Sequence, residues 1–109
     1  MQEILEREAK ILSHDQRVQY FEKGYIGLPG FLSQDWLDCL NQITSDFIEI
    51  SSGLSYEIGI GKDQRFDLEP SHRPGAPRIR RLNSPVDHHE EYWVFASTGP
   101  FVEIAEDLL

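Results

Sequence analysis

The feature that most constrains the fold is a run of large apolar residues that recur at steps of four and three. The run consists of Trp36, Leu40, Ile43, Phe47 and Ile50. This spacing places all of them along one side of an α-helix. Ser33 is a favourable N-cap, and Asp35 suits the positive end of the helix. Leu32 and Leu37 are placed for a hydrophobic staple, and Gly53 would end the helix. Such a stripe could bind a partner, but its periodicity favours packing on the protein's own core.

Two further helices carry clear boundary signals. Ser13 and Gln16 have the spacing of a capping box. A helix is therefore expected from about residue 14 to Lys23, with Gly24 in the position that usually ends one. Pro100 suits the first turn of a last helix. The apolar stripe of that helix would be formed by Phe101, Ile104, Ala105 and Leu108.

Residues 1–12 are predicted to form a short surface helix. Glu3 and Arg7, like Glu6 and Lys10, are favourable pairs four residues apart with the acid on the N-terminal side. The apolar face of this segment is weak, so we expect it to pack loosely.

The remaining segments alternate short strands with turns. Strands are expected at residues 25–28, 65–69 and 78–82, and a short helix at residues 90–96. The other stretches read as a turn at Pro29-Gly30, a loop or irregular hairpin at residues 54–64 and a loop with three prolines at residues 70–77. Together these elements predict an α+β fold that is rich in helices and has a few short strands.

The composition is that of one small globular domain. The chain has 109 residues, of which 39% are hydrophobic, and acidic residues outnumber Lys plus Arg by 19 to 10. The resulting net charge of −9 argues against nucleic acid and against an anionic membrane as partners. The single cysteine excludes an internal disulfide, and no secretory signal or membrane-spanning stretch is present in the sequence. A cytoplasmic protein is therefore expected.

The stretch "PVDHHEEYW", residues 85–93, has the strongest appearance of a metal site. His88 and Glu90 have the His-x-acid spacing that can supply two ligands to a non-haem iron. The third ligand would have to be a histidine from elsewhere, and neither His14 nor His72 has metal-ligand spacing to this pair. The sequence therefore favours a charged helix start, where acidic residues complement the helix dipole.

Four arginines lie within nine positions, and they are the second candidate site. They are Arg73, Arg78, Arg80 and Arg81. Guanidinium groups suit carboxylates and phosphates, so Arg78, Arg80 and Arg81 could contact an anionic substrate. On a regular strand, Arg78 and Arg80 would share one face, and Ile79 and Arg81 the other. The alternative is that the arginines pair with the many Asp and Glu residues of the chain.

Other catalytic templates are incomplete in the sequence. Cys39 stands beside the apolar stripe of a helix, which favours burial over nucleophilic use. The chain has no GxGxxG fingerprint, P-loop or G-x-S-x-G elbow. No complete active site is therefore predicted from the residues alone.

The predicted last helix continues to the end of the sequence. Its final turn lacks the Gly, Asn or Lys that would satisfy the last carbonyl groups. We therefore expect residues 1–109 to be a single incomplete domain, cut within a longer protein.

Two stretches resemble the phytanoyl-CoA dioxygenase family. Residues 16–43, "QRVQYFEKGYIGLPGFLSQDWLDCLNQI", are similar to its opening, with a helix, a Gly-Tyr strand, "LPGFLS" and a long helix. Residues 77–109, "PRIRRLNSPVDHHEEYWVFASTGPFVEIAEDLL", resemble the segment that follows, with an Arg-rich strand, an aromatic helix and a helix that ends in Leu-Leu-Gly. The order and spacing agree over most of the chain.

This resemblance implies the N-terminal part of an Fe(II)- and 2-oxoglutarate-dependent oxygenase on a double-stranded β-helix, or jelly-roll, fold. Such enzymes hydroxylate small molecules or acyl-CoA esters. The family's His-x-Asp pair, distal His and 2-oxoglutarate-binding Lys or Arg all come after the Leu-Leu-Gly helix. The resemblance thus assigns no catalytic, cofactor-binding or metal-binding residue to residues 1–109, which alone would be inactive. Arg78, Arg80 and Arg81 are the candidates for the substrate side. The alternative is a complete, acidic protein-interaction module without catalysis.

Overall fold

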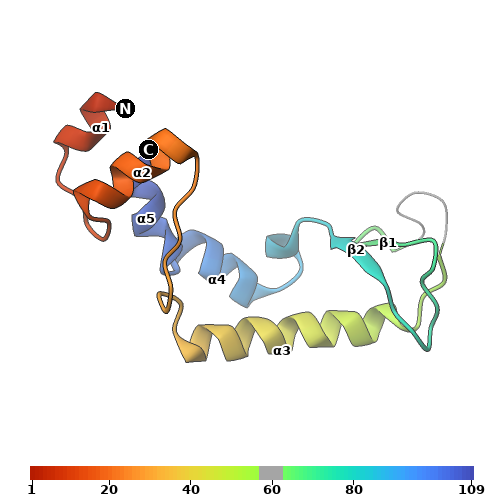
Figure 1. The fold of residues 1–109 in the computed structure, drawn as a ribbon. Coiled ribbons are helices and arrows are strands. Elements are labelled where there is room, and N and C mark those ends of the chain that lie inside the picture. Colours follow the sequence, from red (N-terminus) through yellow and green to blue (C-terminus); the bar gives the residue numbers. More distant parts are fainter. Residues whose placement is uncertain (57–62) are drawn as a thin grey trace. The chain divides into compact units, whose positions relative to one another are not determined.

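The computed structural model describes residues 1–56 and 63–109, and it divides into two compact units. Unit 1 comprises residues 1–33 and 94–109, and unit 2 comprises residues 34–93. The elements are helices and one two-stranded antiparallel sheet, which confirms the α+β prediction (Figure 1). The predicted loop or hairpin at residues 54–64 lies mostly outside the described residues.

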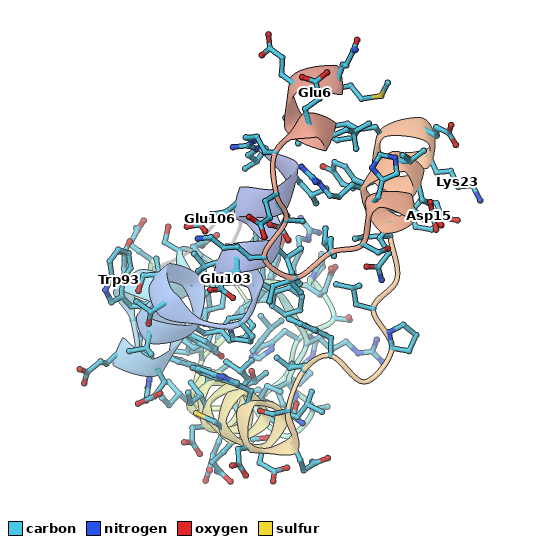
Figure 2. All side chains as sticks on the ribbon, turned by 90° about the vertical axis from the view of Figure 1, so that its left-hand side faces the viewer. Glu6, Asp15, Lys23, Trp93, Glu103 and Glu106 are labelled. Atoms are coloured by element: carbon cyan, nitrogen blue, oxygen red, sulfur yellow. The ribbon has the colours of Figure 1, made fainter. Side chains whose placement is uncertain are left out.

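Unit 1 contains the helices α1 (Gln2–Glu6), α2 (His14–Lys23) and α5 (Phe101–Leu108). The predicted capping box is present: Gln16 N–H donates to Ser13 Oγ at 3.1 Å, and Ser13 N–H donates to Gln16 Oε1 at 2.9 Å. Gly24 then ends α2 in the left-handed conformation, with φ of 83°. Asp15 in the first turn of α2 and Lys23 in its last turn complement the helix dipole (Figure 2).

The predicted helix over residues 1–12 is wrong beyond Glu6, where α1 ends. The segment that follows is not helical, because its backbone N–H groups have a more distant acceptor. Lys10, Ile11 and Leu12 all donate to the carboxylate of Asp107. The charged side chains likewise bind α5 rather than residues four positions away, since Lys10 pairs with Glu106. Tertiary contacts therefore override the local helix signal.

The predicted strand at residues 25–28 is also wrong, because this segment is irregular. A strand needs a hydrogen-bonded neighbour, and the only ladder among the described residues joins other segments. Ile26 and Leu28 instead pack against the core of unit 1. The turn at Pro29-Gly30 is confirmed: Gly30 has φ of 70°, and Phe31 N–H donates to the Leu28 carbonyl.

The core of unit 1 is built by Leu12, Ile104 and Leu108, with four half-buried residues packed around it. These are Tyr20, Ile26, Leu28 and Phe31. The predicted α5 stripe is therefore confirmed for two of its members. Phe101 is 42% exposed and contacts the rings of Phe31 and Phe95, whereas Ala105 is exposed.

Unit 2 contains α3 (Gln34–Ser51), β1 (Phe66–Leu68), β2 (Ile79–Leu82), a 3-10 turn η1 (Pro85–Asp87) and the first residues of α4 (Glu90–Thr98). Its core consists of Ile43 and Phe47 from α3 with Phe66 and Leu68 from β1. Phe47 also stacks on Tyr92, with ring centroids 6.1 Å apart. The α3 stripe is therefore confirmed at its centre, whereas Ile50 is 45% exposed.

The β1–β2 hairpin corrects the predicted side-chain alternation of β2. Asp67 opposes Arg81 and Leu68 opposes Ile79, so Arg80 is an extra residue in a β-bulge. A bulge shifts the phase of a strand, so residues that should point to opposite faces come to share one. Ile79 and Leu82 consequently both pack on the core, and Arg81 is exposed.

Candidate functional site

The histidine pair at residues 88–89 lies at a helix start, as the favoured interpretation predicted. His88 follows η1, and the Nδ1 atom of His89 accepts the N–H of Glu91 at 3.0 Å. Glu90 and Glu91 occupy the first turn of α4, where they complement the helix dipole. Within residues 1–56 and 63–109, no three His, Cys, Asp or Glu side chains converge as a metal site would require.

The arginine cluster lies on the β1–β2 hairpin, where two of its four members have carboxylate partners. Arg80 Nε lies 3.2 Å from Glu69 Oε1, and Arg81 Nε lies 2.9 Å from Asp67 Oδ2. A third pair joins Arg65 to Asp63 at 2.7 Å. The hydrogen bond from Arg65 is the main cause that lowers the pKa of Asp63 below its ordinary value. The predicted pairing with acidic residues is thus confirmed for Arg80 and Arg81.

Arg73 and Arg78 are placed differently from the paired arginines. Arg73 donates to the carbonyl groups of Pro70 and His72, at 3.2 and 2.8 Å. The exposed guanidinium of Arg78 has no hydrogen-bond or ion-pair partner in the part of the chain that the structure describes. It lines an open groove together with Glu69, Ala76, Pro77 and Ile79.

His72 organises the proline loop, a role that the sequence did not predict. Its ring is 1% exposed, and Nδ1 accepts the backbone N–H of Arg78 at 2.9 Å. Nε2 lies 2.9 Å from the Leu54 carbonyl. Because a carbonyl only accepts, Nε2 must carry the proton, and the ring is held as one neutral tautomer. The only sequence signal was a histidine between prolines, beside a strand.

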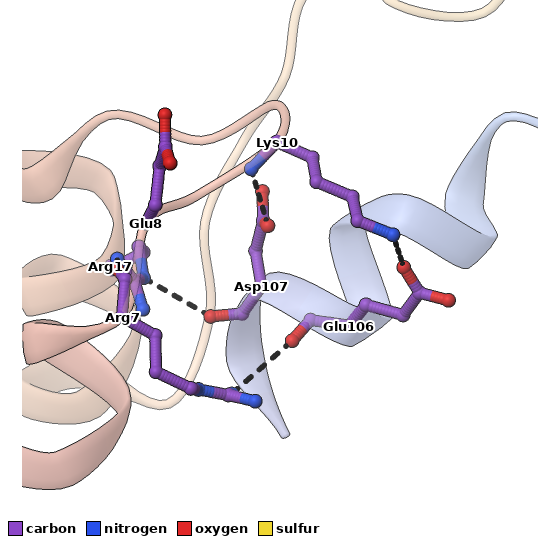
Figure 3. Close-up of a pocket in the computed structure, with 6 residues that line it drawn as sticks. All are labelled: Arg7, Glu8, Lys10, Arg17, Glu106 and Asp107. Carbon is purple, nitrogen blue, oxygen red and sulfur yellow. Dashed lines mark hydrogen bonds and ion pairs between the residues drawn. The ribbon is translucent and has the colours of Figure 1, made fainter.

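A second polar cluster lies in unit 1, around the end of α5 (Figure 3). The carboxylate of Asp107 accepts three successive backbone N–H groups: those of Lys10 at 2.7 Å, Ile11 at 2.8 Å and Leu12 at 2.9 Å. Burial raises the pKa of Asp107, but these three donors and the charge of Arg17 together outweigh burial. The pKa of Asp107 therefore lies below its ordinary value.

Two arginines complete this cluster by donating to main-chain carbonyls. Arg17 is 3% exposed and donates to the carbonyls of Asp107, Arg7 and Ile4. Arg7 donates to the carbonyls of Glu106 and Leu109, at 3.3 and 2.7 Å. The final turn of α5 lacks a Gly, Asn or Lys of its own, but distant side chains bind its last carbonyls. The donors are arginines from the opposite end of the chain. Because the polar groups of this cluster bind one another, the cluster is better explained as a structural element of unit 1 than as a ligand-binding site.

Cys39 is half-buried against the core of unit 2, as predicted. Its Sγ atom lies 4.0 Å from the carboxylate of Glu91. In the described portion of the chain, no helix has both the length and the apolar character needed to cross a lipid bilayer. Comparisons with protein-family models, with curated proteins and with solved structures found no match.

The iron and 2-oxoglutarate implied by the family resemblance do not fit the described residues. His88 and Glu90 come from a turn and a helix start, and no third ligand side chain converges on them among residues 1–56 and 63–109. Beside Arg78, the groove contains one carboxylate, that of Glu69, and Arg80 already pairs with it.

Proposed function

We propose that this chain is the N-terminal part of a phytanoyl-CoA dioxygenase-like, Fe(II)- and 2-oxoglutarate-dependent oxygenase that hydroxylates a small molecule or an acyl-CoA ester. The similarity of residues 16–43 and 77–109 to two consecutive segments of that family carries the proposal. In this proposal, the jelly roll and the ligands of iron and 2-oxoglutarate are supplied by sequence after Leu109.

The order of the elements supports this assignment. A capped helix, a Pro-Gly turn and the long helix α3 follow one another in the first stretch. In the second stretch, strand β2 is followed by the aromatic helix α4 and then by α5. The irregular segment at residues 25–28 departs from the family pattern, which has a strand there.

Within the proposed enzyme, residues 1–109 would position the substrate rather than perform the oxidation. The hairpin presents an arginine-rich edge, on which Arg80 and Arg81 are paired, whereas Arg78 has no ion-pair partner within residues 1–56 and 63–109. A guanidinium that faces an open groove can bind a carboxylate or a phosphate. This role agrees with a substrate that carries an anionic group, such as an acid or a coenzyme A ester.

The coding sequence beyond Leu109 gives a first test. The proposal predicts a glycine immediately after Leu109 and a His-x-Asp motif some tens of residues later. A stop codon directly after Leu109 would sink the proposal and favour the alternative, a complete acidic interaction module.

The behaviour of residues 1–109 in solution distinguishes the same two alternatives. α3 exposes Leu37, Ile48 and Ile50, each at about 40% or more of its surface. If these side chains belong to an incomplete domain, the isolated chain should bind a hydrophobic dye through this exposed apolar surface. A self-sufficient module should unfold in one sharp transition without binding the dye.

A further inference from the structure

The β1–β2 hairpin is a basic region in an acidic protein. Residues 63–82 contain five arginines and three carboxylates, which gives a net charge of +2 with His72 neutral, whereas the whole chain carries −9. Each carboxylate is taken by one arginine, through the pairs Arg65–Asp63, Arg81–Asp67 and Arg80–Glu69. The excess positive charge therefore resides on Arg73 and Arg78.

Only one of these two arginines is available to a ligand. The Arg73 guanidinium donates to two carbonyl groups of its own loop. The Arg78 guanidinium has no partner among the described residues, although the backbone of Arg78 is fixed on both sides. Its N–H donates to the buried ring of His72 and its carbonyl accepts the N–H of Glu69, both at 2.9 Å. The fixed backbone of Arg78 therefore carries a guanidinium whose donors remain available to an anion.

The groove beside Arg78 has the chemistry of an amphiphile site. Ala76, Pro77 and Ile79 provide apolar surface, and Arg78 provides the cation. Glu69 also lines the groove, but Arg80 engages both of its carboxylate oxygens, at 3.2 and 3.3 Å. The paired carboxylate therefore opposes an incoming anion less than a lone one would.

We propose that this groove binds the oxyanion head, a carboxylate or a phosphate, of a ligand whose apolar part lies against Ala76, Pro77 and Ile79. Arg78 binds the head, and His72 is a positioning residue that holds the Arg78 backbone. Arg80 and Arg81 are already paired with Glu69 and Asp67, so the head group is assigned to Arg78. The binding site itself does not depend on the proposed function. Only the role of the ligand as the substrate of an oxygenase rests on it.

The binding is tested by NMR titration of the whole chain with hexanoate and with monohexyl phosphate, at low salt. Hexan-1-ol is the control for the head group, and acetate is the control for the apolar part. Both anionic amphiphiles should shift the signals of Arg78 and Ile79 more than either control does. The head group that binds more tightly identifies the carboxylate or the phosphate as the preferred chemistry.

Three variants assign the effect to the groove. Arg78→Gln should weaken hexanoate binding about threefold to fivefold, as expected for one exposed ion pair. Lys23→Gln removes the same charge from α2 and should leave the binding unchanged. Glu69→Gln removes the carboxylate of the groove and releases Arg80, so it should strengthen the binding.

Equal binding by the Arg78→Gln variant and the unaltered chain would overturn the inference, as would binding of hexan-1-ol as tightly as hexanoate. Weaker binding by Glu69→Gln would overturn it as well. These outcomes are separable from the proposed function, because binding to residues 1–109 needs neither iron nor 2-oxoglutarate. If the groove binds hexanoate but the protein has no oxygenase activity, the binding site is supported and only the proposed reaction is contradicted.

Discussion

At the scale of single residues, Asp107 makes the most consequential contacts in unit 1. Its carboxylate accepts three N–H groups from residues 10–12, nearly a hundred positions earlier in the sequence. In Asp107→Asn, the amide keeps only one acceptor oxygen and turns an NH2 group toward the remaining donors. The free energy of unfolding should fall by about 1–3 kcal/mol, the cost of leaving such donors unsatisfied.

Chemical denaturation followed by circular dichroism measures this loss. Glu103→Gln is the matched control, because it removes one negative charge from an exposed position of the same helix (Figure 2). The two variants should differ clearly in denaturation midpoint. If they lose the same stability, the loss comes from net charge and not from the hydrogen bonds of Asp107.

The same carboxylate should make the stability depend on pH. The pKa of Asp107 is lowered in the folded chain, and the ordinary value for the side chain is 3.8. An acid with a depressed pKa contributes stability that is complete above the ordinary value and is lost as the pH falls through the folded value. Asp63, whose pKa is lowered by Arg65, acts in the same direction in unit 2.

The stability that these two carboxylates contribute should therefore be complete at about pH 5 and above and should be lost below about pH 4. Denaturation midpoints measured across this range would test the expectation. Asp107→Asn should show a shallower decline than the unaltered chain, since one of the linked carboxylates is gone. Identical slopes for the two proteins would show that Asp107 is not linked to folding.

At the scale of elements, the bulge in β2 decides which side chains of the hairpin support the core. Leu82→Ala should destabilise the chain by about 1–2 kcal/mol, because Leu82 is half-buried against the core of unit 2. Arg80→Ala is the control on the same strand, and it should leave the denaturation midpoint close to its original value, because its pair with Glu69 is exposed. A larger loss of stability in Arg80→Ala than in Leu82→Ala would contradict the bulge and would support a regular strand without it.

The elements that the sequence predicted well are those with local signals. The capping box of Ser13 and Gln16 and the left-handed Gly24 define both ends of α2 within a few residues. The four-and-three spacing of α3 likewise identified Ile43 and Phe47 as core residues. A bulge has no comparable signature, because it arises from the pairing of two strands. The phase of β2 around Arg80 was therefore not predictable.

At the scale of the whole molecule, the contacts that the sequence could not predict join its two ends. Arg17 lies within the predicted helix of residues 14–23, where no local signal marks it, yet its guanidinium is buried and donates to carbonyls that include that of Asp107. Residues 7–12 are not helical as predicted, because several of their backbone N–H groups donate to Asp107 in the same cluster. Patterns within a short window carry no information about such distant partners, and His72 in the proline loop escaped prediction for the same reason.

Succinate formation is the decisive measurement of the proposed oxygenase activity. The protein that continues beyond Leu109 should convert 2-oxoglutarate to succinate in the presence of Fe(II) and should stop when the iron is chelated. Residues 1–109 alone, under the same conditions, should form no succinate. Succinate produced by residues 1–109 alone, or none from the iron-loaded longer protein with its substrates, would contradict the account.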